Sequence, residues 1–168
     1  MNRMVIKRAT LEDRSVIECI LFDAVKWLNE MNQPLWRIED VKWEALAKSY
    51  LIEDFYIAYG NNEPSGCMAL VDFDPVFWPD VAKGEALMIH KLAVVKNARK
   101  AGVADALIQY AKEEGRKRQV GTVRLDCRQD RQRLRSFYER HGFVCVHEKT
   151  LRGKWDVAFY SHSLIWKG

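Results

Sequence analysis

Residues 92–104 read Leu-Ala-Val-Val-Lys-Asn-Ala-Arg-Lys-Ala-Gly-Val-Ala and join a strand-like run to the beginning of a helix. The apolar run extends from Ala86 to Val95, and the helical pattern begins at Gly102. A small-residue turn between a strand and a helix leaves backbone N–H groups for an anion, and the helix dipole adds partial positive charge. Three basic residues add full charges beside this turn: Lys96, Arg99 and Lys100. Taken alone, the stretch fits either an anion site or an ordinary joint with solvated lysines.

Length and composition are those of a globular protein with one domain, residues 1–168. Of the 168 residues, 48% are hydrophobic and 30% are charged, which excludes disordered and fibrous proteins. No apolar run reaches membrane-spanning length, and the N-terminus lacks the apolar stretch of a signal peptide. The four cysteines lie far apart, and the four histidines form no pair at ligand spacing. We therefore expect a cytoplasmic protein with reduced cysteines, no metal site and no membrane partner.

Positive charge is concentrated in one part of the chain. The formal net charge is +4, but residues 96–140 hold 13 Lys and Arg against 6 Asp and Glu, a local balance of +7. Such a region indicates a polyanionic partner, either nucleic acid or a phosphate-rich cofactor. Solvated helix faces explain part of the excess.

The hydrophobic periodicity predicts an alternating arrangement of strands and helices. Strands are expected at 5–9, 55–59, 66–73, 86–95, 122–127, 143–146 and 155–165, and helices at 13–30, 38–51, 102–117 and 131–141. A longish hairpin loop is expected at 60–64. An ordered functional loop or a partner contact is expected at 74–79, where two prolines flank aromatics. The crossover from 86 to 127 requires parallel strands, whereas the hairpins are antiparallel. We expect an α/β fold with an α+β-like mixed sheet of about seven strands and helices on both faces.

Two motifs stand at defined places in this order. Residues 99–104, Arg-Lys-Ala-Gly-Val-Ala, directly follow a strand that ends in Leu92-Ala93-Val94. Residues 137–143, Phe-Tyr-Glu-Arg-His-Gly-Phe, come about 35 residues downstream. The first fits the Arg/Gln-x-x-Gly-x-Gly/Ala loop of the GCN5-related N-acetyltransferase (GNAT) family. The second is similar to that family's Tyr-Glu-Lys-x-Gly-Phe signature, so the whole chain resembles the family.

The resemblance implies a single GNAT domain over residues 1–168, with acetyl-CoA as cosubstrate and no metal. It implies transfer of an acetyl group to a primary amine by direct attack in a ternary complex. The acceptor would be a small molecule or a peptide, which the sequence does not identify. Nucleic acid and membrane are not expected as partners, and a homodimer is left open because the family often dimerises.

The resemblance also implies a set of cofactor-binding residues. In the family, the strand backbone pairs with the pantetheine arm, and one N–H, here that of Leu92, polarises the thioester carbonyl. Gly102 has no Cβ, so backbone N–H groups can approach the pyrophosphate closely. The expected set is Leu92, Ala93, Val94, Arg99, Lys100, Ala101, Gly102, Val103, Ala104 and Asp130.

Two of these residues depart from the family pattern. The family often has glycine where Lys100 stands, and we expect Lys100 to have ordinary backbone angles. Many members have asparagine where Asp130 stands, and an aspartate cannot donate a hydrogen bond as the amide does. Ala104 is an accepted variant.

Three residues are candidates for the chemistry. Tyr138 stands at the position of the family's general acid, which protonates the departing CoA thiolate; the alternative is a core tyrosine on the apolar side of its helix. His90 and Glu85 are candidates for the base that helps the amine lose its proton. For both, a solvent-facing strand residue or a turn carboxylate is an equally good interpretation.

Four tryptophans belong to segments where the acceptor is expected: Trp27, Trp36, Trp43 and Trp78. Trp27 and Trp43 are predicted to be helix core residues. Trp36 and Trp78 lie beside proline-bearing loops and are the candidates for a substrate pocket.

Two other functions remain as alternatives. One is a non-catalytic CoA-binding regulator on the same fold. The other is a nucleic-acid-binding module that uses the basic region, which is disfavoured because the chain lacks a recognised nucleic-acid motif.

Overall fold

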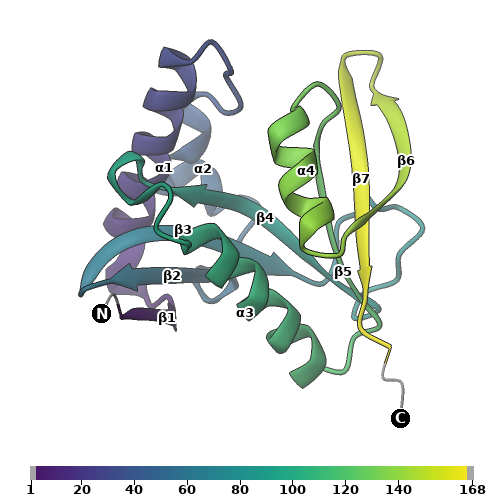
Figure 1. Ribbon diagram of the computed structural model, residues 1–168, viewed down its shortest axis with the longest axis horizontal. Coiled ribbons are helices and arrows are strands. Elements are labelled where there is room, and N and C mark those ends of the chain that lie inside the picture. Colours follow the sequence, from purple (N-terminus) through teal and green to yellow (C-terminus); the bar gives the residue numbers. More distant parts are fainter. Residues whose placement is uncertain (1–2, 166–168) are drawn as a thin grey trace. The chain divides into compact units, whose positions relative to one another are not determined.

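The computed structural model describes residues 3–165 (Figure 1). The chain divides into two compact units. The first unit comprises the residues up to Leu70 together with His90–Leu107, and the second comprises Val71–Ile89 together with the residues from Ile108 onward. The chain passes from one unit to the other three times, in two different strands and in one helix. Among the described residues, no helix combines the length and the apolar character needed to cross a membrane.

Within residues 3–165, seven strands and four α-helices make up the fold. The strands are β1 (Met4–Arg8), β2 (Phe55–Gly60), β3 (Glu63–Val71), β4 (Ala86–Val94), β5 (Thr122–Arg128), β6 (Val144–Leu151) and β7 (Trp155–Ser163). The α-helices are α1 (Arg14–Glu30), α2 (Trp43–Leu46), α3 (Val103–Lys117) and α4 (Gln132–Arg140), and short 3-10 turns are η1 (Leu11–Asp13), η2 (Ile38–Val41), η3 (Ile52–Asp54) and η4 (Lys96–Ala98). Pairing follows the order β1-β2-β3-β4-β5-β7-β6; β4–β5 is parallel, and β1–β2, β2–β3, β5–β7 and β7–β6 are antiparallel. The expected mixed sheet of seven strands is confirmed.

In the first unit, helices cover both faces of the strands. The apolar stripe of α1 is buried against β2, β3 and β4, where it forms a core with Phe55, Ile57 and Cys67. Neighbouring residues of a strand point to opposite faces, so Gly66 faces away from this core. A Cβ built on Gly66 would lie 2.8 Å from both the Ala93 carbonyl oxygen and the Val103 side chain. The first turn of α3 therefore packs directly on the backbone of β3.

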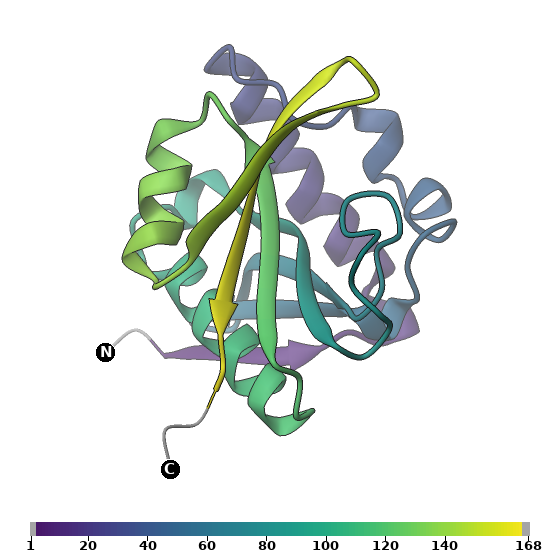
Figure 2. The same cartoon turned by 90° about the vertical axis from the view of Figure 1, so that its right-hand side faces the viewer.

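In the second unit, β7 separates α4 from the loop that precedes β4 (Figure 2). Phe159 packs with Trp78 of that loop, with ring centroids 5.1 Å apart. The next residue, Tyr160, points to the other face and lies 6.1 Å from the ring of Tyr138 on α4. The alternation of strand side chains thus gives β7 one face for the loop and one for the helix.

Two of the predicted segments are wrong. The helix expected at 38–51 is only η2 and the four-residue α2, because Lys42 between them has extended backbone angles, φ −70° and ψ 145°. The loop expected at 60–64 is a two-residue turn, since Gly60 already pairs with Glu63. Asn61 and Asn62 supply φ values of 52° and 69°, which asparagine tolerates better than most residues.

Replacing Gly66 by alanine is expected to destabilise the protein by about 1–3 kcal/mol, because the new methyl group would overlap backbone as well as side-chain atoms. Gly121→Ala is a matched control, since its Cβ would meet only the Glu85 carbonyl oxygen at 3.9 Å. Urea denaturation of both variants measures the difference. Equal stability of the two variants would contradict the close approach of α3 to β3.

Candidate functional site

The loop between β4 and α3 has two residues in the left-handed region. Lys100 has φ 71° and Gly102 has φ 78°. The expectation of ordinary backbone angles at Lys100 is therefore wrong: the lysine adopts a left-handed conformation that favours glycine. The end of β4 is fixed to β3, because the Val95 N–H donates to the Ser65 carbonyl oxygen over 3.0 Å.

The beginning of α3 presents a row of free backbone donors. The first helical bond of this turn runs from the Ala106 N–H to the Gly102 carbonyl oxygen over 3.0 Å. No residue of the described part of the chain accepts a hydrogen bond from the N–H of Gly102, Val103 or Ala104. A Cβ on Gly102 would meet no atom within 4 Å, so the row is open to an anion.

The other predicted cofactor residues of the first unit differ in exposure. Val103 and Ala93 are buried, and their side chains pack in the unit rather than outward. Leu92 and Val94 are half-buried, while Ala101 is exposed. These residues can therefore offer mainly backbone groups to a ligand.

Basic side chains flank the donor row, as predicted. Lys100 is exposed. Arg99 is exposed as well, and its guanidinium carbon lies 3.9 Å from the ring centroid of Trp27 on α1. The prediction that Trp27 is only a core residue missed this contact.

His90, on β4, lies in a cluster of half-buried aromatic residues of the first unit. The Tyr50 hydroxyl and the His90 Nδ1 are 2.8 Å apart, a hydrogen bond that orients the imidazole ring. The next residue, Lys91, has φ 52°, and its ammonium lies 5.1 Å from the ring of Trp36 and 6.0 Å from that of Tyr50. The sequence pointed to His90 and Trp36 but gave no signal for Tyr50, which lies 40 residues from His90.

Tyr138 belongs to the second unit and is buried on the inner side of α4. Its ring packs against Phe143 and Tyr160, with centroids 6.2 and 6.1 Å away. Burial raises the pKa of the Tyr138 phenol well above its ordinary value, with smaller contributions from Cys127 and Asp126. The phenol therefore keeps its proton at neutral pH.

A polar network holds α4 to β7 beside Tyr138. The Arg135 Nε donates to the Tyr160 hydroxyl over 2.9 Å, and that hydroxyl donates to Glu139 over 2.9 Å. Arg135 also binds the Glu148 carboxylate of β6 at 2.6 Å, and these hydrogen bonds raise the pKa of the Arg135 guanidinium. Because Tyr160 is fully buried, each of its partners is strongly constrained.

The remaining predicted site residues of the second unit have structural contacts. The exposed Glu85 carboxylate accepts the Ala82 N–H over 2.8 Å. Asp130 forms a two-point ion pair with Arg128, at 3.1 and 3.2 Å, and hydrogen bonding from Arg128 lowers the pKa of this carboxyl. Trp78 is 4% exposed, packed on Phe159, so it offers little surface to a ligand and lies in the core instead of a pocket.

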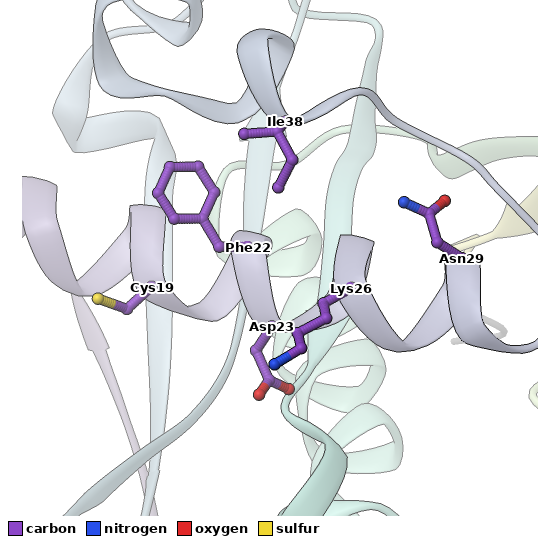
Figure 3. Close-up of a pocket in the computed structure, with 6 residues that line it drawn as sticks. All are labelled: Cys19, Phe22, Asp23, Lys26, Asn29 and Ile38. Carbon is purple, nitrogen blue, oxygen red and sulfur yellow. The ribbon is translucent and has the colours of Figure 1, made fainter.

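A shallow hollow of about 530 Å³ lies along α1 (Figure 3). Its lining residues are Cys19, Phe22, Asp23, Lys26, Asn29 and Ile38. Phe22 and Ile38 point toward each other on one side of the helix, whereas Asp23 extends from another side (Figure 3). None of the predicted site residues lines this hollow.

Comparison with known proteins assigns the chain to a family. The sequence profile of the Acetyltransferase (GNAT) family matches residues 22–143. The chain is also 24% identical over 148 residues to an uncharacterized N-acetyltransferase, YesJ, of Bacillus subtilis (strain 168), covering 80% of this chain and 78% of that protein.

Solved structures share the fold. A GNAT-family acetyltransferase from Listeria monocytogenes 4b F2365 has a TM-score of 0.76 at 19% identity, covering 95% of this chain and 94% of that one. N-acetylglutamate synthase from Neisseria gonorrhoeae, solved with coenzyme A and N-acetyl-glutamate, has a TM-score of 0.68 at 18% identity. That match covers 98% of this chain and 36% of the synthase.

The left-handed backbone at Lys100 has a measurable consequence. Lys100→Val is expected to destabilise the protein by about 1–2 kcal/mol, because a β-branched side chain crowds the backbone there, while Lys100→Gly is expected to be tolerated. Lys42→Val is the control, an exposed lysine with extended angles. If thermal unfolding shows equal losses at both positions, the conformation assigned to Lys100 is incorrect.

Proposed function

The chain belongs to the acetyltransferase (GNAT) family, and we propose that it transfers the acetyl group of acetyl-CoA to a primary amine by direct attack in a ternary complex. The observation that carries this proposal is the row of free N–H donors at Gly102, Val103 and Ala104. Such a row at a helix N-terminus suits the pyrophosphate of coenzyme A. Arg99 and Lys100 add positive charge on the same loop.

The end of β4 is proposed to receive the rest of the cofactor. The backbone of Leu92, Ala93 and Val94 would pair with the pantetheine arm as an added strand. The Leu92 N–H would donate to the thioester carbonyl oxygen, which becomes negative when the amine attacks. Gly102, where a Cβ would meet no atom within 4 Å, and the exposed Ala101 would let the backbone approach the phosphates. Asp130 is held by Arg128, and we assign it no donor role toward the arm.

The acceptor amine must lose a proton before it attacks. An alkylammonium has a pKa near ~10.4, so exposing its free base at neutral pH costs roughly 4–5 kcal/mol. We assign this task to His90, directly or through water, because Tyr50 orients its ring and it stands two residues before Leu92. Glu85 is the weaker candidate, since its carboxylate caps a turn and it stands seven residues before Leu92.

Tyr138 is proposed to complete the reaction. The amine nitrogen forms a bond to the thioester carbon, the C–S bond breaks, and the leaving thiolate takes the phenolic proton. Burial raises the pKa of the phenol, so the group carries its proton at neutral pH. A covalent cysteine intermediate is not needed, and burial raises the pKa of both Cys67 and Cys127 to about 12, so neither thiol ionises readily.

The acceptor is proposed to lie against Trp36. This half-buried indole is near Lys91 and belongs to the same unit as His90. Its flat face can contact an apolar or cationic acceptor. Trp78 is not assigned to the acceptor, because its ring is packed in the second unit.

A thiol-release assay with acetyl-CoA and a panel of amines tests the proposal. At least one primary amine is expected to release CoA and to appear acetylated by mass spectrometry. Tight binding of CoA without turnover of any amine would instead favour the non-catalytic CoA-binding regulator. Salt-sensitive RNA binding without CoA binding would favour the nucleic-acid module.

Tyr138→Phe keeps the buried ring but removes the proton donor, so kcat is expected to fall about 10²–10⁴-fold. The KM for acetyl-CoA should stay within about twofold, because the phenyl ring still fills the same space. Because the folded-state pKa of Tyr138 is raised, its deprotonation should not limit kcat below about pH 10. Tyr59→Phe, a part-buried tyrosine of β2, is the control. An unchanged kcat in Tyr138→Phe would remove this residue from the mechanism.

A further inference from the structure

One face of α1 contacts the loop that carries Lys96, Arg99 and Lys100. The side chains of Asp23, Trp27 and Glu30 stand four and then three positions apart, which places them on one side of a helix. All three contact the η4 loop of the same unit. The Asp23 carboxylate accepts the Lys96 N–H over 2.7 Å, and Glu30 lies 3.5 Å from the Lys96 ammonium.

The third contact holds Arg99. Its guanidinium carbon lies 3.9 Å from the Trp27 ring centroid, so the planar group rests on the indole. Stacking occupies the face of a guanidinium and leaves its N–H edges available for a second ligand. Within residues 3–165, no group accepts a hydrogen bond from the Arg99 side chain.

The indole N–H of Trp27 indicates why a tryptophan stands here. Its Nε1 is buried and has no hydrogen-bond partner among the described residues. A buried donor without a partner is costly, so packing alone would favour an apolar side chain at this position. The feature that a leucine could not reproduce is the broad aromatic face that Arg99 covers.

The two contacts to Lys96 differ in how much they contribute to stability. The Glu30–Lys96 pair is exposed on both sides, and such pairs contribute little. The Asp23 hydrogen bond is charge-assisted and fixes the first residue of η4, from which Arg99 is three residues away. Asp23 and Trp27 therefore fix both ends of the short turn.

We propose that Trp27 and Asp23 are positioning residues for the cofactor. They hold Arg99 with its N–H edges turned outward, so that it binds a phosphate of coenzyme A in a two-point contact. This inference rests on the proposed function. It adds a role for α1, through Arg99, at the phosphate end of the cofactor and not at the acetyl group.

Calorimetric titration with CoA tests the inference without requiring turnover. Trp27→Leu is expected to raise the Kd for CoA about 5–10-fold, and Trp27→Phe, which keeps an aromatic face, should recover most of the loss. In turnover, Trp27→Leu should raise the KM for acetyl-CoA with an unchanged kcat. Asn29→Ala, on the same helix, is the matched control and should leave the Kd within about twofold.

The double variant separates positioning from general stability. If Trp27 acts through Arg99, Trp27→Leu should add less than about twofold to the Kd in an Arg99→Ala background. Independent, multiplying losses would overturn the inference, as would a Kd in Trp27→Leu equal to that of the unchanged protein. If Trp27→Leu fails to fold, variants of the exposed Arg99 test the two-point contact instead. Lysine lacks the planar guanidinium, so Arg99→Lys should weaken CoA binding as much as Arg99→Ala. Full binding by Arg99→Lys would also overturn it. No CoA binding by the unchanged protein would contradict the proposed function itself.

Discussion

The contact between the first turn of α3 and the backbone of β3 is the constraint on which the proposed cofactor loop, residues 95–104, depends. At Gly66 there is no room for a side chain, because the Ala93 carbonyl oxygen and Val103 occupy that space. The helix therefore begins at a fixed position beside the end of β4. The N–H groups of Gly102, Val103 and Ala104 keep their direction because the turn that carries them cannot move away from the sheet.

The sequence was sufficient where a pattern reports a local preference. The apolar stripe of α1 and the crossover that contains α3 are predicted correctly because each has a strong hydrophobic period. The prediction of a single helix at 38–51 is wrong because apolar spacing does not distinguish one helix from consecutive short turns. The first half of β6 was found, but its polar half at His147, Glu148 and Lys149 was missed, since that exposed stretch has no apolar alternation.

In the candidate site, too, local motifs could be predicted and contacts between distant residues could not. Residues 99–104 and Tyr138 can be recognised in the sequence because each belongs to a short motif of consecutive residues. The contacts that support them join distant positions: Tyr50 with His90, Trp27 with Arg99, and Arg135 with Tyr160. Single-sequence patterns carry no information on such pairs, so Trp27 was assigned to the core. Trp78 differs for the opposite reason: two flanking prolines pointed to a loop, but the side chain is buried.

The buried hydroxyl of Tyr160 has a consequence for anyone who redesigns or transplants the helix that bears Tyr138. Glu139 follows Tyr138 in the signature, but its hydrogen-bond donor comes from β7, and the donor to that hydroxyl comes from Arg135 one helical turn earlier. The short signature is thus not a portable module. Grafted onto another scaffold without a tyrosine on the facing strand, it would bring the Glu139 carboxylate without its donor. The smallest transferable part is the helix together with its strand.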